Sequence, residues 1–134
     1  AVHSMGDAMA GELIEGGCLC GAVRYRATGP PQHQTMCYCA NCRRASGAQS
    51  VAWVSVSRGA VEFTRGEPSR YRYAREDGRN IERVFCGDCG TQLTYAADGP
   101  DDGVDITTGS LDDPEAYPPH GESWAEEKLS WVKS

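Results

Sequence analysis

The amino-acid sequence predicts a mainly β domain made of antiparallel sheets, with few short helical turns. Short stretches rich in valine, tyrosine, isoleucine and threonine recur along the 134 residues, and glycine-containing turns separate them. Short strands and turns at such regular spacing are typical of antiparallel sheet. Beyond residue 49, the stretches that we expect to be strands are 50–57, 61–63, 70–73, 81–85, 91–95 and 104–108.

An earlier strand is expected around Val23 and Tyr25. These residues alternate with Arg24 and Arg26, which is the period of two expected for a half-buried strand. The sequence Gly-Pro-Pro at 29–31 should end this strand.

Only short helical turns are expected elsewhere. One should follow Cys39, and at most one should form near 124–129, in an irregular segment that starts at Leu111. We expect residues 11–134 to form a single domain, since this length is close to the commonest domain size. Residues 1–10 are expected to be a flexible leader left over from expression.

Composition and charge disfavour several classes of function. The formal net charge of −6 argues against non-specific nucleic-acid binding, which depends on neutralising phosphates. No apolar run approaches the ~18 residues of a membrane-spanning helix. The odd cysteine count does not fit a complete disulfide framework, and no signal-peptide core is visible. These features favour a cytoplasmic, reducing compartment in which thiols persist.

The seven cysteines occur at spacings typical of metal ligands. Two pairs, Cys18/Cys20 and Cys86/Cys89, are far apart in the sequence. On extended chain, side chains at positions i and i+2 point to the same side, so Cys18 and Cys20 can share one metal. Cys86 and Cys89 flank a glycine-containing turn of the zinc-knuckle type. We therefore expect these four thiolates to form a closed structural zinc site.

The stretch from Cys37 to Cys42 holds the other three cysteines, at positions 37, 39 and 42. Three protein ligands leave one coordination position of zinc for water or substrate, as in catalytic zinc sites. One alternative is a second structural zinc with His33 or His120 as its fourth ligand. One of these cysteines could also be a simple buried thiol, or the group could bind an iron–sulfur cluster, although the spacings differ from the common ferredoxin runs.

Arg43 and Arg44 follow the last of these cysteines. They could offset the negative charge of the site and bind the carboxylates of an acidic substrate or of glutathione, or they could be ordinary surface arginines. His120 lies in a loop and could move protons at the second metal, although loop histidines are more often plain surface. Trp124 and Trp131 are expected to pack the C-terminal segment against the domain, with a place in the wall of a pocket as the less favoured alternative.

Four motifs together resemble the glutathione-dependent formaldehyde-activating enzyme (GFA) family, whose superfamily includes the centromere protein V domain. They are Gly-x-Cys-x-Cys-Gly-x-Val-x-Tyr at 16–25, Cys-x-Cys-x-x-Cys-Arg-Arg-x-Ser-Gly-Ala at 37–48, Phe-Cys-x-x-Cys-Gly-Thr-x-Leu at 85–93 and Gly-Ser-Leu-Asp-Asp-Pro at 109–114. The resemblance implies a β-tent fold with a structural zinc on the four outer cysteines and a catalytic zinc on Cys37, Cys39 and Cys42.

The resemblance also implies an activity. The family is named for joining glutathione to formaldehyde, the reverse direction of a carbon–sulfur lyase. We therefore expect a zinc-dependent enzyme that adds a small-molecule thiol to a small aldehyde, with Cys37, Cys39, Cys42, Arg43 and His120 as its catalytic residues. The alternative is a non-catalytic zinc-binding module that binds a small molecule or a protein partner.

Overall fold

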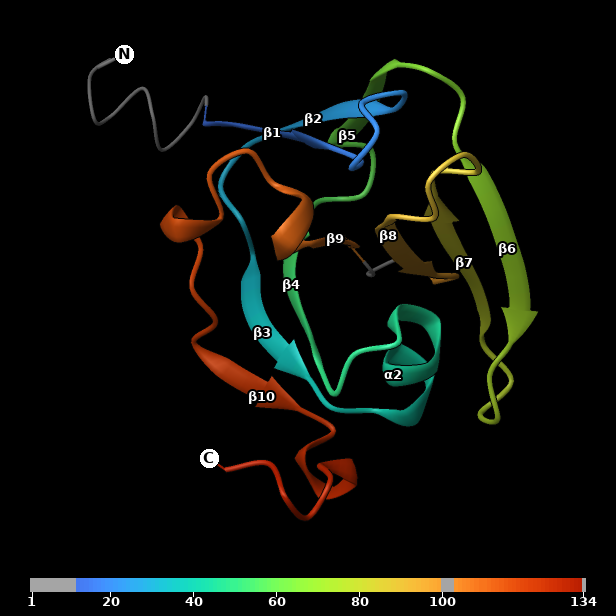
Figure 1. The fold of residues 1–134 in the computed structure, drawn as a ribbon, viewed down its shortest axis with the longest axis vertical. Coiled ribbons are helices and arrows are strands. Elements are labelled where there is room, and N and C mark those ends of the chain that lie inside the picture. The colour runs from blue at the N-terminus through green and yellow to red at the C-terminus, as the bar shows by residue number, and fades with distance from the viewer. Residues whose placement is uncertain (1–11, 100–102, 134) are drawn as a thin grey trace.

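A computed structural model describes residues 12–99 and 103–133 and shows two β-sheets and one short α-helix (Figure 1). The leader expected at 1–10 lies outside the described residues. The smaller sheet has the strand order β1-β2-β5 and is drawn across the top of Figure 1. Its strands are β1 (Leu13–Gly17), β2 (Arg24–Thr28) and β5 (Val61–Arg65).

The larger sheet has seven strands in the order β10-β3-β4-β9-β8-β7-β6. Its strands are β3 (His33–Cys37), β4 (Val51–Val56), β6 (Ser69–Ala74), β7 (Asn80–Phe85), β8 (Gln92–Ala97), β9 (Val104–Thr107) and β10 (Gly121–Ser123). The helix α2 covers Ala40–Ser46, and three 3-10 helices, η1 (Thr108–Ser110), η2 (Pro114–Ala116) and η3 (Ala125–Glu127), follow β9.

The prediction of a mainly β, antiparallel fold is confirmed. All strand pairs are antiparallel except β10 with β3, which is parallel. Strand β10 belongs to the C-terminal segment and forms one edge of the larger sheet. The helical turn expected after Cys39 is α2, and the one expected near 124–129 is η3. Among the described residues, no helix has the length and apolar character needed to cross a membrane.

The main hydrophobic core lies between the two sheets. Ile14 and Tyr25 from the small sheet pack with Val54, Leu93 and Ile106 from the large one, and all five are nearly inaccessible to solvent. Burial of these apolar side chains is the main source of stability expected for such a domain.

Gly16 permits the close approach of the small sheet to the segment after β9. A side chain at Gly16 would overlap the Tyr25 hydroxyl and the Ser110 backbone carbonyl. The Tyr25 hydroxyl also hydrogen-bonds the Ser110 side chain at 2.6 Å. The Gly-Ser-Leu motif is therefore held against β1 by packing and by a buried polar contact.

The local conformation predicted for Cys18 and Cys20 is wrong. Cys18 and Cys20 were expected on extended chain, but they lie in the turn that joins β1 to β2. The turn still brings both sulfurs together, 3.7 Å apart. The physical reason is that β1 and β2 pair as a hairpin, so the residues between them must reverse direction.

Candidate metal centres and cavity

The four outer cysteines converge on one point. The sulfurs of Cys18, Cys20, Cys86 and Cys89 all lie within 4.8 Å of one another. Four thiolates arranged tetrahedrally around zinc at ~2.3 Å would be separated by about 3.8 Å. The Cys18–Cys20 and Cys20–Cys86 sulfur separations are 3.7 and 3.8 Å. The donor set therefore fits a closed tetrahedral zinc site.

This group joins the two sheets, because Cys18 and Cys20 lie in the turn of the small sheet and Cys86 and Cys89 lie between β7 and β8 of the large one. Backbone N–H groups donate to its sulfurs, as in the contact from Val23 to Cys18 at 3.3 Å. The Thr91 hydroxyl lies 3.2 Å from the Cys89 sulfur and is the main cause that lowers the pKa of Cys89 to about 5. These donors stabilise thiolates, the form that binds metal.

The other three cysteines form a second group, separate from the first. Cys37 ends β3, Cys39 is the N-cap residue of α2, and Cys42 lies in the first turn of that helix. The backbone N–H of Cys42 donates to the Cys39 sulfur at 3.3 Å, so the helix cap and the metal-ligand motif are one local structure. The three sulfurs lie within 4.8 Å of one another.

The electrostatics of this second group suit a cation. Hydrogen bonds from Cys37, and then from Cys42, lower the pKa of Cys39 to about 2. Cys37 and Cys39 in turn raise the pKa of Cys42, and burial adds to that rise. One thiolate therefore suppresses ionisation of its neighbours, which is the effect of like charges held together. A divalent metal would remove this repulsion, and three thiolates supply three of the four ligands that zinc takes.

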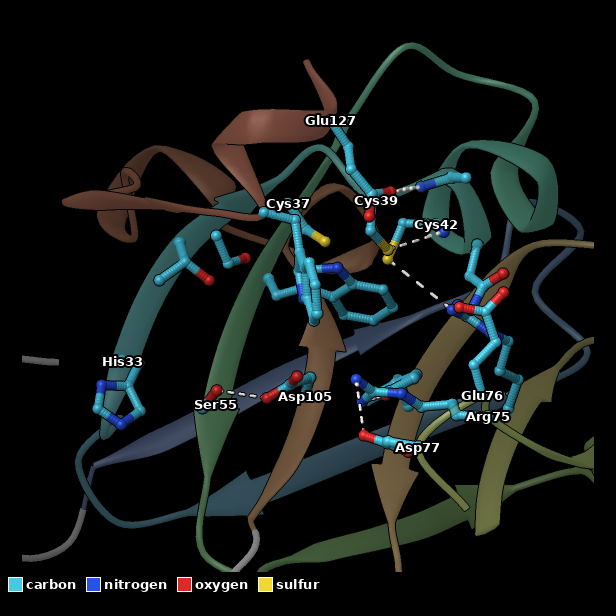
Figure 2. A pocket seen from close by; sticks show the side chains of 18 residues that line it. His33, Cys37, Cys39, Cys42, Ser55, Arg75, Glu76, Asp77, Asp105 and Glu127 are labelled. Atoms are coloured by element: carbon cyan, nitrogen blue, oxygen red, sulfur yellow. Dashed lines mark hydrogen bonds and ion pairs between the residues drawn. The ribbon is translucent and has the colours of Figure 1, made fainter. Parts of the chain in front are cut away.

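The three-cysteine group opens into a cavity of about 520 Å³. Figure 2 shows the three cysteines at one end of the cavity and His33, Ser55 and Asp105 toward the other. Its floor is the face of the large sheet, and its remaining walls come from α2, the turn between β6 and β7, and the C-terminal segment. None of the four outer cysteines lines it.

Arg83 is the buried cation of this cavity, since only 4% of the residue is exposed. Its Nη2 atom lies 3.8 Å from the Cys42 sulfur, its Nε donates to the Tyr73 hydroxyl at 2.9 Å, and its guanidinium lies 4.8 Å from the centroid of the Tyr95 ring. Among the described residues, no carboxylate pairs with Arg83, so the thiolates are its available counter-charge.

A second arginine stands at the rim of the cavity. Arg75 donates to the Tyr95 hydroxyl at 2.9 Å, pairs with Asp77 at 3.3 Å, and places its guanidinium 5.7 Å from the Trp124 ring centroid. Trp124 has a positive φ of 55°, which is rare for a bulky residue and is found mostly at functional sites. Trp124 lines the cavity, which was the less favoured of its two expected roles.

The other sequence-derived candidates lie outside this cavity lining. Arg43 donates from Nη1 to the backbone carbonyls of Tyr38 and Glu127, both at 2.9 Å, and so fastens the C-terminal segment to α2. Arg44 is exposed on the helix. His120 lines a separate hollow on the edge of the sheet, where its ring lies 3.3 Å from the Gln34 amide.

Sequence reasoning missed Arg75, Arg83 and Asp105 as residues of the cavity. Each belongs to a strand or a strand end far in sequence from Cys37, Cys39 and Cys42, and strand pairing brings them to the cavity. The sequence did indicate Asp105, because an aspartate between the apolar residues of a short strand is unusual and often has a functional role.

Comparison with known proteins agrees with this architecture. The family model described as glutathione-dependent formaldehyde-activating enzyme matches residues 13–127. A protein of Halomonas elongata, provisionally named as such an enzyme, is 36% identical over 86 residues, which cover 60% of this chain and 54% of the relative. The chain thus spans about half the length of that curated relative.

A crystal structure of a Rhodobacter sphaeroides protein has the same fold, with a TM-score of 0.62 and 19% identity over 81% of this chain and 99% of that one. Fold and site together define a mainly β protein with two cysteine groups that could each hold a metal ion. Since the family model covers most of its length, the chain belongs to the glutathione-dependent formaldehyde-activating enzyme family.

Proposed function

We propose that the protein is a zinc-dependent enzyme, of the carbon–sulfur lyase type, that adds a thiol to a small aldehyde at Cys37, Cys39 and Cys42. The observation that carries the proposal is the contrast between the two cysteine groups. The three-cysteine group opens into a large cavity, whereas none of the four other cysteines lines that cavity. The outer group is proposed to hold a structural zinc.

When bound by the three cysteines, zinc would supply a coordination position at which a thiol stays deprotonated at neutral pH. Arg83 would offset the negative charge that accumulates on the sulfurs, since its guanidinium touches Cys42. Arg75 is placed to bind a carboxylate at the cavity rim, a role that Arg43 and Arg44 were expected to fill. Trp53 and Tyr95, 5.9 Å apart between ring centroids, form the apolar wall beside them.

Glutathione is the candidate thiol and formaldehyde the candidate aldehyde, because these substrates give the family its name. In the addition, the thiol sulfur forms a bond to the carbonyl carbon, and the proton lost by the thiol ends on the carbonyl oxygen. We place this reaction in a reducing compartment such as the cytoplasm, where the cysteines of both groups stay reduced and able to bind metal.

Thiols add to formaldehyde without help, so the test is acceleration over that background. Exchange NMR on the zinc-loaded protein should show faster interconversion of glutathione and its formaldehyde adduct than in buffer. Cys42→Ser should abolish the acceleration, whereas Arg44→Gln, a change on the exposed face of α2, should keep it. If the zinc-loaded wild type gives only the background rate with glutathione and with other small thiols, the proposed activity is wrong.

A further inference from the structure

A row of polar side chains crosses the cavity floor from one end to the other. Strand register places His33 opposite Ser55, Ser55 opposite Asp105, Asp105 opposite Tyr95, and Tyr95 opposite Arg83. All five residues line the cavity. Neighbouring strands are ~4.8 Å apart, so the acidic residue and the buried cation are separated by roughly 10 Å across the sheet.

Asp105 differs from the other carboxylates of the cavity, among which Glu76 is exposed to solvent. Asp77 is paired with Arg75, and Glu127 accepts the backbone N–H of Ala40 at 2.8 Å. Asp105 accepts a short hydrogen bond from the Ser55 hydroxyl, and no lysine or arginine among the described residues pairs with it. A half-buried carboxylate that forms no ion pair with lysine or arginine gains free energy when a ligand supplies a cation.

The protonation equilibrium of Asp105 supports this reasoning. Burial raises its pKa above the ordinary value, while the Ser55 hydroxyl and the charge of His33 act in the opposite direction. The net rise shows that the carboxylate is less well stabilised in the cavity than in water. A cationic group of a ligand would restore that stabilisation.

Strand geometry sets the size of the ligand. Cys37 and His33 are four residues apart on β3, which corresponds to about 13 Å of extended chain. Asp105 belongs to the His33 row but lies two strands across from β3, so the backbone diagonal from Cys37 is roughly 16 Å. The cysteine and aspartate side chains both shorten this gap, so a ligand with its sulfur at the cysteines must extend on the order of 10 Å to reach Asp105. A chain of about three residues, at ~3.3–3.6 Å each, has this length.

We propose that Asp105, oriented by Ser55, binds a primary ammonium group at the end of the thiol substrate that is remote from the sulfur. The substrate class is then a peptide-sized aminothiol, with its sulfur at the three cysteines and its ammonium group against Asp105. This inference rests on the proposed function, since it assumes that the sulfur of the ligand is held by the metal at Cys37, Cys39 and Cys42.

The test compares two thiols that differ only in the amine. Glutathione and its analogue without the amino group, glutarylcysteinylglycine, are titrated into the zinc-loaded protein at pH 7.5 by calorimetry. In the wild type, loss of the amine should weaken binding about tenfold or more, as expected for a hydrogen bond between charged groups. In Asp105→Asn the two thiols should bind within about twofold of each other. Glu76→Gln, a change in an exposed residue of the same cavity lining, should keep the wild-type preference.

The outcomes separate this inference from the proposed function. Equal binding of both thiols to the wild type overturns the role of Asp105 while leaving a thiol-binding site intact. An amine preference that survives in Asp105→Asn overturns it as well. If neither thiol binds the wild type, the proposed function fails and the inference fails with it. The comparison of the two thiols on the wild type needs no variant, so poor folding of Asp105→Asn would not block the test.

Discussion

Replacement of Arg83 by glutamine should weaken metal binding at the three-cysteine group without affecting the outer group. The guanidinium is buried, and its Nη2 atom lies 3.8 Å from the Cys42 sulfur. The variant keeps a polar side chain but removes the positive charge. Mutation of a residue that contacts a metal ligand commonly lowers the metal affinity by about 10–100-fold.

The magnitude can be worked out from this geometry. Two full charges at that distance interact by about 4 kcal/mol at an effective dielectric constant of about 20. Three thiolates with one Zn²⁺ carry a net charge of about −1 spread over three sulfurs, so each sulfur holds about a third of it. In the metal-free group the negative charge is held by Cys39, while the raised pKa keeps Cys42 a neutral thiol. Metal binding therefore brings this third of a charge onto the sulfur that Arg83 contacts, and the loss is at most about 1.5 kcal/mol, or roughly tenfold in the dissociation constant of the metal.

The assay is competition for zinc with a chromophoric chelator, which separates the weaker from the tighter of two sites. Arg83→Gln should release the weaker zinc at about one tenth of the chelator concentration that the wild type needs, and Arg83→Lys should fall between them. Arg75→Gln is the matched control, because Arg75 is paired with Asp77 and contacts no cysteine among the interactions found. Equal dissociation constants, within about twofold, for Arg83→Gln and the wild type would refute the reasoning.

The remaining predictions concern stability. Cys18→Ser or Cys89→Ser should lower the melting temperature by about 10 °C or more. Losing a metal that joins two sheets should cost about 3 kcal/mol or more of folding free energy, at roughly 3–4 °C per kcal/mol. Cys42→Ser should lower the melting temperature far less, and similar melting of these variants by circular dichroism would contradict the division of roles. Because burial raises the pKa of Asp105, wild-type stability is lost as the pH rises through the folded pKa. The melting temperature of Asp105→Asn relative to wild type should therefore increase from about pH 4 to pH 7, and a pH-independent difference would show that the carboxylate is not destabilised.

Much of the fold followed from local patterns. Period-two alternation and glycine turns marked β2 and the strands from β4 to β9, and cysteine spacing alone divided the seven thiols as the structure groups them. The strands β1, β3 and β10 were missed because their sequences lack a strong strand signal: β3, for example, is His-Gln-Thr-Met-Cys. Their conformation comes from pairing with neighbours, a tertiary effect that outweighs propensity.

The cavity was the least predictable part. Arg83 looks like one of several arginines on alternating strands, yet it is buried while Arg72, on the neighbouring strand β6, is exposed. Which face of a strand turns inward depends on register and on the neighbouring sheet, neither of which is visible in a short segment. Conversely, Tyr71 is a large aromatic residue in an expected strand, yet it is 61% exposed, because it lies on the edge strand β6.

We propose that a metal held by Cys37, Cys39 and Cys42 would take the substrate thiol as its fourth ligand. The most direct test of this proposal is to replace the more easily removed zinc with cobalt(II) and to record the sulfur-to-cobalt charge-transfer absorption while glutathione is added. The account expects a saturable increase in that absorption in the wild type, with the outer zinc retained and no such increase in Cys42→Ser. A spectrum that stays unchanged at saturating glutathione, with cobalt still bound, would contradict it.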